Sequence, residues 1–132
     1  MKLSIGTAQF GFKYGICNKL GIVKKNEIKK IINFCKLKKI KSIDTAQGYG
    51  RSQRVLGKFN LREFELTTKI SNIPEHNNIN LEKKINSEIN KILKELNVKQ
   101  VYALLIHNTD KLKGKFGKSL FEILLKIKKK IK

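Results

Sequence analysis

Four side chains of complementary chemistry lie at, or just beyond, the ends of short β-prone runs. They are a carboxylate, a phenol, an ammonium and an imidazole: Asp44, Tyr49, Lys69 and His107. A phenol is a weak acid with an ordinary pKa near ~10, but an adjacent ammonium favours the phenolate and lowers that pKa. Lys69 would supply the ammonium, and Asp44 would keep it charged. His107 would hydrogen-bond a carbonyl oxygen beside the phenol, so the set predicts a site for reducing a carbonyl group.

Each of these residues also has a purely structural interpretation. Asp44 could bond the backbone of the following turn, and Tyr49 could pack beneath its own loop. Lys69 could be one of many solvated lysines, and His107 a hydrogen-bonded histidine near the core. Their shared position decides the matter, because the C-terminal ends of parallel strands lie on one face, where barrel enzymes carry their chemistry. We therefore interpret the four residues as one site.

Hydrophobic periodicity indicates strands that alternate with helices. Residues 24–39 carry apolar side chains at helical spacing, and a second amphipathic helix begins near Asn80, a candidate N-cap. Short runs rich in β-formers separate the helices. The predicted strands are residues 3–8, 41–46, 64–70 and 101–106. The predicted helices are residues 24–39, residues 52–59, one from residue 80, and one carrying Leu120, Ile123, Leu124, Ile127 and Ile131.

Strand–helix alternation with short connections favours parallel strands joined by right-handed crossovers. The chain of 132 residues shows no linker and no change of composition, so we expect one α/β domain over residues 1–132. Complete barrels of this kind contain eight β/α units in ~250 residues. The fold prediction is therefore the N-terminal half of a TIM-type (β/α) barrel with about four of its eight units, in other words a truncated half barrel.

Five segments, in order along nearly the whole chain, resemble the N-terminal motifs of the aldo-keto reductases. They are Ile5–Gly11, Asp44–Gly50, Arg51–Gly57, Thr68–Lys69 and Leu105–Asn108. The most specific is the Asp-Thr-Ala-x-x-Tyr-Gly wording of the second segment, in which the acid precedes the phenol by five residues. One departure is Gln53, where the family usually has Glu. We expect that difference to affect the capping of the short helix rather than the chemistry.

The resemblance implies an NADP-dependent oxidoreductase that reduces an aldehyde or a ketone to an alcohol. It implies that Tyr49 is the proton donor, that Lys69 and Asp44 tune it, and that NADPH delivers hydride. His107 would orient the small carbonyl substrate. The implied cofactor contacts are Gly6, Thr7 and Asp44, and the implied substrate contacts are Gln9, Phe10, Tyr14 and Asn108. In this family the second half of the barrel carries most of the NADP(H) site, so we expect most of that site to be absent from this chain.

The strongly basic composition allows a different class of function. The formal net charge is +20, which suggests a polyanion as partner. However, only three of the 30 basic residues are Arg, the residue favoured for reading bases and phosphates, and the lysines are scattered along the chain. We therefore expect nucleic acid not to be a partner. The alternatives are a small lysine-rich protein that binds nucleic acid or another polyanion, and an inactive gene remnant.

Other sequence features narrow the class of protein. Cys17 and Cys35 have no neighbouring Cys or His at metal-ligand spacing, so we expect reduced thiols and no metal site. The longest apolar run, Val101–Ile106, is far short of a bilayer span, and the N-terminus lacks a signal-peptide core. These features predict a cytoplasmic protein with no membrane partner. A half barrel also leaves two open sheet edges, through which we expect the chain to self-associate.

Overall fold

The computed structural model describes residues 3–74 and 80–130 and contains one sheet of four parallel strands. The strands are β1 (Ser4–Gly6), β2 (Ser42–Asp44), β3 (Glu65–Ile70) and β4 (Ala103–Ile106), and they follow one another in the sheet in chain order. Each strand pairs in parallel with its neighbour. The α/β fold and the parallel partial barrel are thereby confirmed, although every strand is shorter than the run that predicted it.

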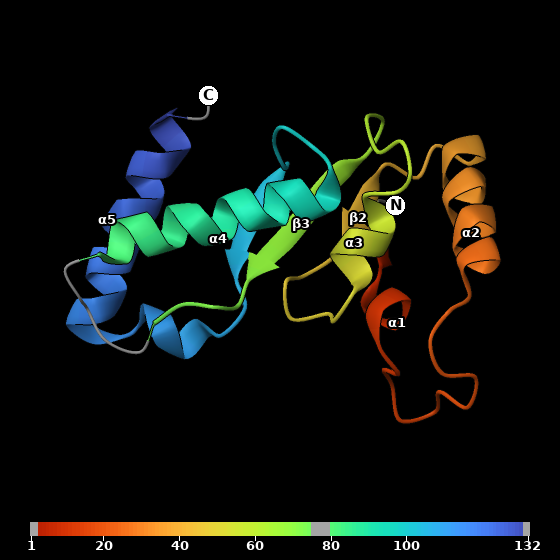
Figure 1. Cartoon of the computed structure of the whole chain (residues 1–132), viewed down its shortest axis with the longest axis horizontal. Helices are drawn as coiled ribbons and strands as arrows, with labels where there is room; N and C mark the ends of the chain where they lie inside the picture. The colour runs from red at the N-terminus through yellow and green to blue at the C-terminus, as the bar shows by residue number, and fades with distance from the viewer. Residues whose placement is uncertain (1–2, 75–79, 131–132) are drawn as a thin grey trace.

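Helices follow the strands as expected. They are α1 (Ala8–Gly11), α2 (Lys25–Leu37), α3 (Ser52–Leu56), α4 (Leu81–Leu96), the 3-10 helix η1 (Thr109–Leu112) and α5 (Gly114–Lys130). In Figure 1 the units lie side by side along the long axis in chain order, from red at α1 and orange at α2 to blue at α5. Asn80 occupies the N-cap position of α4 as predicted, but its side chain makes no capping hydrogen bond. Ile131, predicted to continue the apolar stripe of α5, lies outside the described residues.

The first predicted strand, residues 3–8, extends too far. The strand ends at Gly6, and Ala8 begins α1, which the sequence analysis did not predict. The reason lies at Thr7, whose backbone leaves the extended region (φ −116°, ψ 16°). Its hydroxyl donates to the backbone oxygen of Asp44 at 2.9 Å, and its own backbone oxygen accepts from the Phe10 N–H at 3.0 Å. A contact between strands therefore turns the chain where the local β-propensity favoured a strand.

The two faces of the sheet differ in composition because successive strand side chains point to opposite sides. On one face Ile43, Leu66 and Ile70 are almost fully buried and belong to the same hydrophobic core as residues of α2, α4 and α5. On the other face Asp44 and Lys69 are only partly buried. The helices therefore cover the aliphatic face, and the polar face is the one that holds the candidate site.

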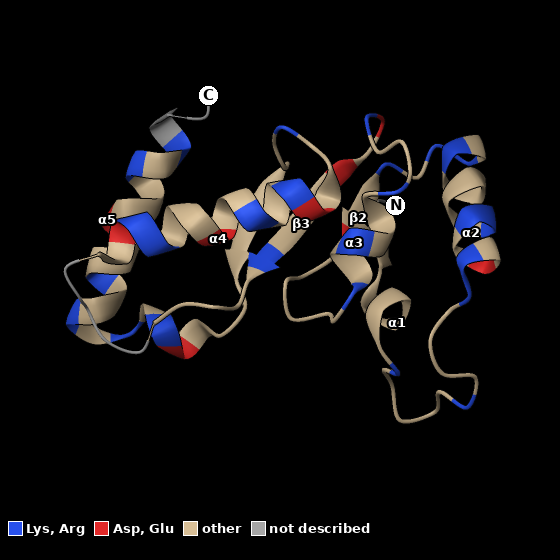
Figure 2. Cartoon of the chain, in the orientation of Figure 1, with Lys and Arg blue, Asp and Glu red and all other residues tan. Residues whose placement is uncertain are grey.

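Basic side chains are distributed over the molecule. Figure 2 shows Lys or Arg on α2, α3, α4 and α5 and on several loops. Among residues 3–74 and 80–130, no helix has both the length and the apolar character that crossing a membrane requires.

Candidate active site

Lys69 lies at the centre of the candidate site. Its Nζ donates to both carboxylate oxygens of Asp44, at 2.6 Å and 2.7 Å, and to the Tyr49 hydroxyl oxygen at 3.3 Å. The sheet register produces this arrangement, because Asp44 pairs with Thr67 and Lys69 follows on the same face of β3 two residues later. The predicted pairing of Asp44 with Lys69 is confirmed. The phenol, which lies in the loop after β2, completes the cluster.

The surroundings of Lys69 keep its side chain charged. Burial acts to lower its pKa, but the hydrogen bonds to Asp44 and Tyr49, together with the negative charge of Asp44, outweigh burial and raise the pKa of Lys69 above its ordinary value of 10.5. The ammonium also lies 5.0 Å from the centroid of the Tyr49 ring. A phenolate formed when Tyr49 gives up its proton would therefore face a fixed positive charge.

Glycines allow the loop that carries Tyr49 to approach α1. A Cβ on Gly11 would lie 1.7 Å from the Tyr49 backbone oxygen and 2.7 Å from the Ser52 nitrogen. Gly50 adopts a positive φ of 58°, a conformation that L side chains rarely take. Glycine at these two positions thus lets the backbones of α1 and the tyrosine loop pack against each other. This contact fixes the position of the Tyr49 backbone.

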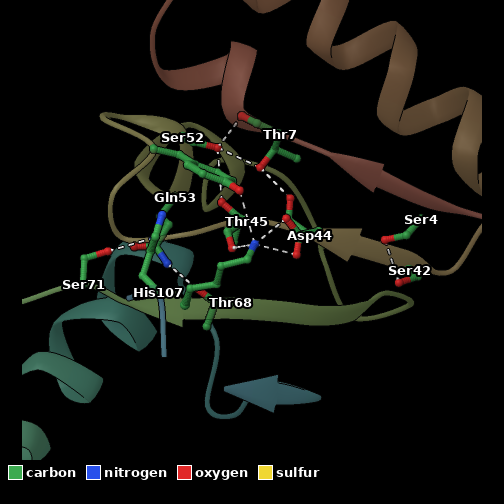
Figure 3. Close-up of polar contacts among 12 residues, drawn as sticks. Ser4, Thr7, Ser42, Asp44, Thr45, Ser52, Gln53, Thr68, Ser71 and His107 are labelled. Atoms are coloured by element: carbon green, nitrogen blue, oxygen red, sulfur yellow. Dashed lines mark hydrogen bonds and ion pairs between the residues drawn. The ribbon is translucent and has the colours of Figure 1, made fainter. Parts of the chain in front are cut away.

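Three fully buried hydroxyls anchor the same loop beneath the site. The Ser52 hydroxyl donates to the Thr7 backbone oxygen at 2.9 Å and contacts the hydroxyl oxygens of Thr7 and Thr45 at 2.9 Å and 3.2 Å. Figure 3 shows these side chains converging between β1, β2 and α3. Thr7 was predicted to contact the cofactor, but its side chain is buried and bonded inside this cluster. The sequence analysis gave Ser52 no such role, although Ser52 lies in the segment Arg51–Gly57 that carries part of the family resemblance.

His107 faces the phenol from the other side. The two rings meet edge to face, with centroids 5.8 Å apart and planes at 86°. The Nδ1 atom of His107 lies 3.1 Å from the Ser71 hydroxyl, a contact that is also visible in Figure 3. Because Nδ1 is occupied, Nε2 is the ring nitrogen left to meet a ligand. The structure therefore brings Asp44, Tyr49, Lys69 and His107 together.

Three of the four predicted substrate contacts lie in or just after α1. Phe10 was expected at the substrate mouth, but its ring is 4% exposed and belongs to the core, because α1 turns it inward. Gln9 and Tyr14 are exposed and joined, the Gln9 amide donating to the Tyr14 backbone oxygen at 3.0 Å. The aromatic side chain that does lie near the phenol is Phe12, with ring centroids 6.4 Å apart. The prediction of Phe10 was therefore wrong, and the sequence analysis did not name Phe12.

Asn108, the remaining predicted substrate contact, has a local role in the structure. Its side-chain oxygen accepts from the Asp110 backbone N–H at 2.9 Å and caps η1. The side chain is exposed and lies next to His107 in sequence. Its carbonyl oxygen is thus engaged by the backbone.

Gln53 differs from its predicted role in helix capping. The N-cap of α3 is Arg51, and Gln53 is 1% exposed inside the fold. Its amide donates to the Thr68 hydroxyl at 2.7 Å, while its Oε1 has no hydrogen-bond partner among the described residues. Gln53 therefore ties α3 to the residue that precedes Lys69.

An open face at the C-terminal ends of the strands surrounds the four residues. A Cβ built on Gly6 would meet nothing within 4 Å, and Gly6 lies opposite Asp44 in the sheet register. A cavity of about 910 Å³ lies elsewhere, lined by residues that include Leu61, Val98 and Tyr102. These lining residues surround the N-terminal ends of β3 and β4, whereas the candidate site lies at the C-terminal ends. The cavity is therefore separate from the site.

A parallel β/α sheet with titratable side chains at the C-terminal ends of its strands defines part of an enzyme barrel of the TIM type. A family model described as the aldo/keto reductase family matches residues 2–132, and the chain belongs to that family.

Solved structures agree with this assignment at the level of the fold. A putative aldo-keto reductase from Pseudomonas aeruginosa, PA4992, is similar with a TM-score of 0.76 and 21% identity, over 98% of this chain and 51% of that one. A second structure of a putative aldo-keto reductase from the same organism gives 0.74 and 20%, over 98% and 50%. The thermostable aldo-keto reductase Tm1743, solved with the inhibitor epalrestat, gives 0.58 and 22%, over 81% and 38%. The chain thus spans about half the length of the Pseudomonas structures. A search of curated protein sequences gave no significant match.

Proposed function

We propose that this chain supplies the acid–base residues of an NADP(H)-dependent oxidoreductase that reduces an aldehyde or ketone to an alcohol. The observation that carries the proposal is the position of the Lys69 ammonium, within hydrogen-bond distance of both Asp44 carboxylate oxygens and the Tyr49 hydroxyl. Membership of the aldo/keto reductase family supports the same reaction class.

Each of the four side chains has its own role in the reduction of the carbonyl. The Tyr49 hydroxyl donates a proton to the carbonyl oxygen as negative charge develops there, and Lys69 stabilises the phenolate left behind. Asp44 holds the ammonium in place through two short hydrogen bonds. His107 orients the carbonyl oxygen beside the phenol through Nε2. The site thus positions a proton donor and a second polar group against one oxygen atom.

The residues present fit the nicotinamide end of the cofactor. The open space above Gly6, beside Asp44, would receive the ring, and NADPH when bound would supply hydride to the carbonyl carbon. Lys69 is already engaged by Asp44 and is not free to bind phosphate. We therefore expect weak NADPH binding and turnover near background from these four units alone, and reduction once further β/α units close the barrel.

Two assays test the proposal. In the first, NADPH fluorescence is titrated with the chain, and weak binding is expected. In the second, the chain is fused to the second half of the PA4992 barrel, and loss of NADPH absorbance is followed with an aromatic aldehyde. Tyr49→Phe should lower kcat by roughly 10²–10⁴-fold, the usual contribution of a general acid.

Tyr102→Phe is the matched control, since Tyr102 lies 72% exposed at the other end of the sheet. It should retain the rate of the fusion. A Tyr49→Phe fusion as active as the parent would refute the role of Tyr49, and strong Tyr49-dependent turnover by the chain alone would refute the need for further units.

A further inference from the structure

A second polar network, which does not include the side chain of Lys69, joins the two loops beside the site. Its hub is Gln47, two residues before Tyr49. The Gln47 side-chain oxygen accepts from the Ser71 N–H at 3.0 Å and from the Asn72 N–H at 3.2 Å. Its backbone N–H also donates to the Lys69 backbone oxygen at 3.0 Å. Gln47 thus holds the loop after β2 against the loop after β3.

Glu88 on α4 fixes the orientation of this amide. Backbone N–H groups can only donate, so Oε1 of Gln47 must face them and Nε2 must point away. Nε2 donates to Oε2 of Glu88, which also accepts from the Asn72 amide at 3.2 Å. The other carboxylate oxygen, Oε1, pairs with Lys84 at 3.0 Å. Glu88 is 6% exposed, and a carboxylate so deeply buried is stable only with such partners. The mechanism above leaves this carboxylate without a role.

The network extends to His107 through Ser71. Gln47 accepts a hydrogen bond from the Ser71 N–H. The hydroxyl of the same residue lies 3.1 Å from Nδ1 of His107. Gly48 covers this contact, since a Cβ there would lie 3.0 Å from the Ser71 hydroxyl and 3.1 Å from Cε1 of His107. His107 follows the edge strand β4 and is exposed, so local packing alone does not fix its ring.

We propose that Gln47, held by Glu88, is a positioning residue that sets Ser71 so that its hydroxyl donates to Nδ1 of His107. A neutral imidazole that accepts at Nδ1 carries its proton on Nε2, the tautomer able to donate to a carbonyl oxygen. The importance of this tautomer for the reaction rests on the proposed function. The tautomer itself is a property of the chain and is measurable without substrate or cofactor.

The test uses ¹⁵N NMR of the histidine imidazole in the full chain, with the His107 signals assigned from His107→Gln. The parent should show His107 with its proton predominantly on Nε2. Because a free neutral histidine already favours Nε2–H, Ser71→Ala should raise the minor Nδ1–H fraction only to that of the free side chain, whereas Ser71→Thr, which keeps the hydroxyl, should retain the lower fraction of the parent. Because Ser71 contributes one side-chain hydrogen bond from a partly exposed loop position, Ser71→Ala is expected to fold.

A charge swap tests the role of Gln47. Gln47→Glu places a second carboxylate against Glu88, and the repulsion should release Ser71 and mix the His107 tautomers. The double variant Gln47→Glu with Glu88→Gln restores a donor facing an acceptor and should recover the parent spectrum. Gln53→Glu is the matched control, because it makes the same change at a buried glutamine with no contact to Glu88, and it should leave the His107 tautomer unchanged.

Two outcomes overturn the proposal. One is a His107 spectrum in Ser71→Ala that equals that of the parent, and the other is a double variant no closer to the parent than Gln47→Glu. If Gln47→Glu does not fold, the Ser71 pair still decides whether the hydroxyl sets the tautomer. Failure of the proposed reduction would appear separately, as a correct tautomer in a closed barrel without Tyr49-dependent turnover.

Discussion

The central strands and the edge strand β4 hold their functional side chains in different ways. Asp44 and Lys69 extend from β2 and β3, which bury Ile43 and Ile70 completely on the helix-covered face. His107 follows β4, none of whose residues is fully buried, and its ring is fixed by one hydrogen bond and one ring contact. The Asp44–Lys69 ion pair therefore extends from strands anchored in the core, whereas the imidazole depends on a neighbouring loop.

The largest expected effect measures this difference in packing directly. Ile70→Ala, at a fully buried position, should lower the free energy of unfolding by about 2–5 kcal/mol, because it removes buried methyl groups and leaves a cavity. Leu105→Ala on β4, where the side chain is 46% exposed, should cost less than about 1 kcal/mol. Urea unfolding of both variants gives the two values. Equal losses would show that β4 is as well supported as β3.

A pair of glycine substitutions tests the backbone contact that places Tyr49. Gly11→Ala would put a methyl carbon 1.7 Å from the Tyr49 backbone oxygen, and the two segments must separate. We expect a loss of about 1–3 kcal/mol or more in unfolding free energy, as for other overpacked sites. Gly6→Ala meets nothing within 4 Å and should leave stability within about 0.5 kcal/mol of the parent. The comparison would fail if both variants melted at the same temperature.

The same contrast explains what the sequence could predict. Strand–helix alternation is local, and it correctly predicted that Asp44, Lys69 and His107 would reach one face of a parallel sheet. The five-residue spacing from Asp44 to Tyr49 likewise depends on one loop. Residues whose position is determined by the local sequence of one β/α unit were therefore predictable.

Apart from the pairing of Asp44 with Lys69, contacts between units were not predictable from the sequence alone. Thr7 and Ser52 are 45 residues apart, and Gln47 and Glu88 are 41 apart, so nothing in the local pattern pairs them. The inward turn of Phe10 follows from α1, which in turn follows from the hydrogen bond between Thr7 and Asp44. The glycines at 11, 48 and 50 were the available signal, because a cluster of glycines around a tyrosine is typical of close backbone approach.

A smaller effect concerns Glu88, which links α4 to both site loops. Burial acts to raise its pKa, but the ion pair with Lys84 and the hydrogen bonds from Asn72 and Gln47 outweigh burial and lower the pKa below its ordinary value of 4.5. A carboxyl with a lowered folded-state pKa stabilises the fold above the unfolded value, and that contribution is lost as the pH falls through the folded value.

We therefore expect Glu88→Gln to be less stable than the parent at neutral pH and to lose less stability on acidification below pH 4.5. Urea midpoints measured across that range give both curves. The exposed carboxylate of α5 provides the control, since Glu122→Gln should follow the parent. If the urea midpoints of the parent and Glu88→Gln fell by the same amount on acidification, the proposed effect of this carboxylate on stability would be wrong.

The smallest expected effect is at the open edges. β1 and β4 each pair on one side only among the described strands, and unpaired strand edges favour association with another chain. The net charge of +20 opposes that association, so sedimentation velocity should show larger species as protein or salt concentration rises, because salt screens the repulsion. Leu105→Lys, which adds a charge to the exposed face of β4, should weaken association several-fold, whereas Phe121→Lys on α5 should do so only slightly. The prediction would be wrong if the chain stayed monomeric and melted cooperatively at every concentration. In that case the edge strands, although less buried than the central pair, would not associate with another chain.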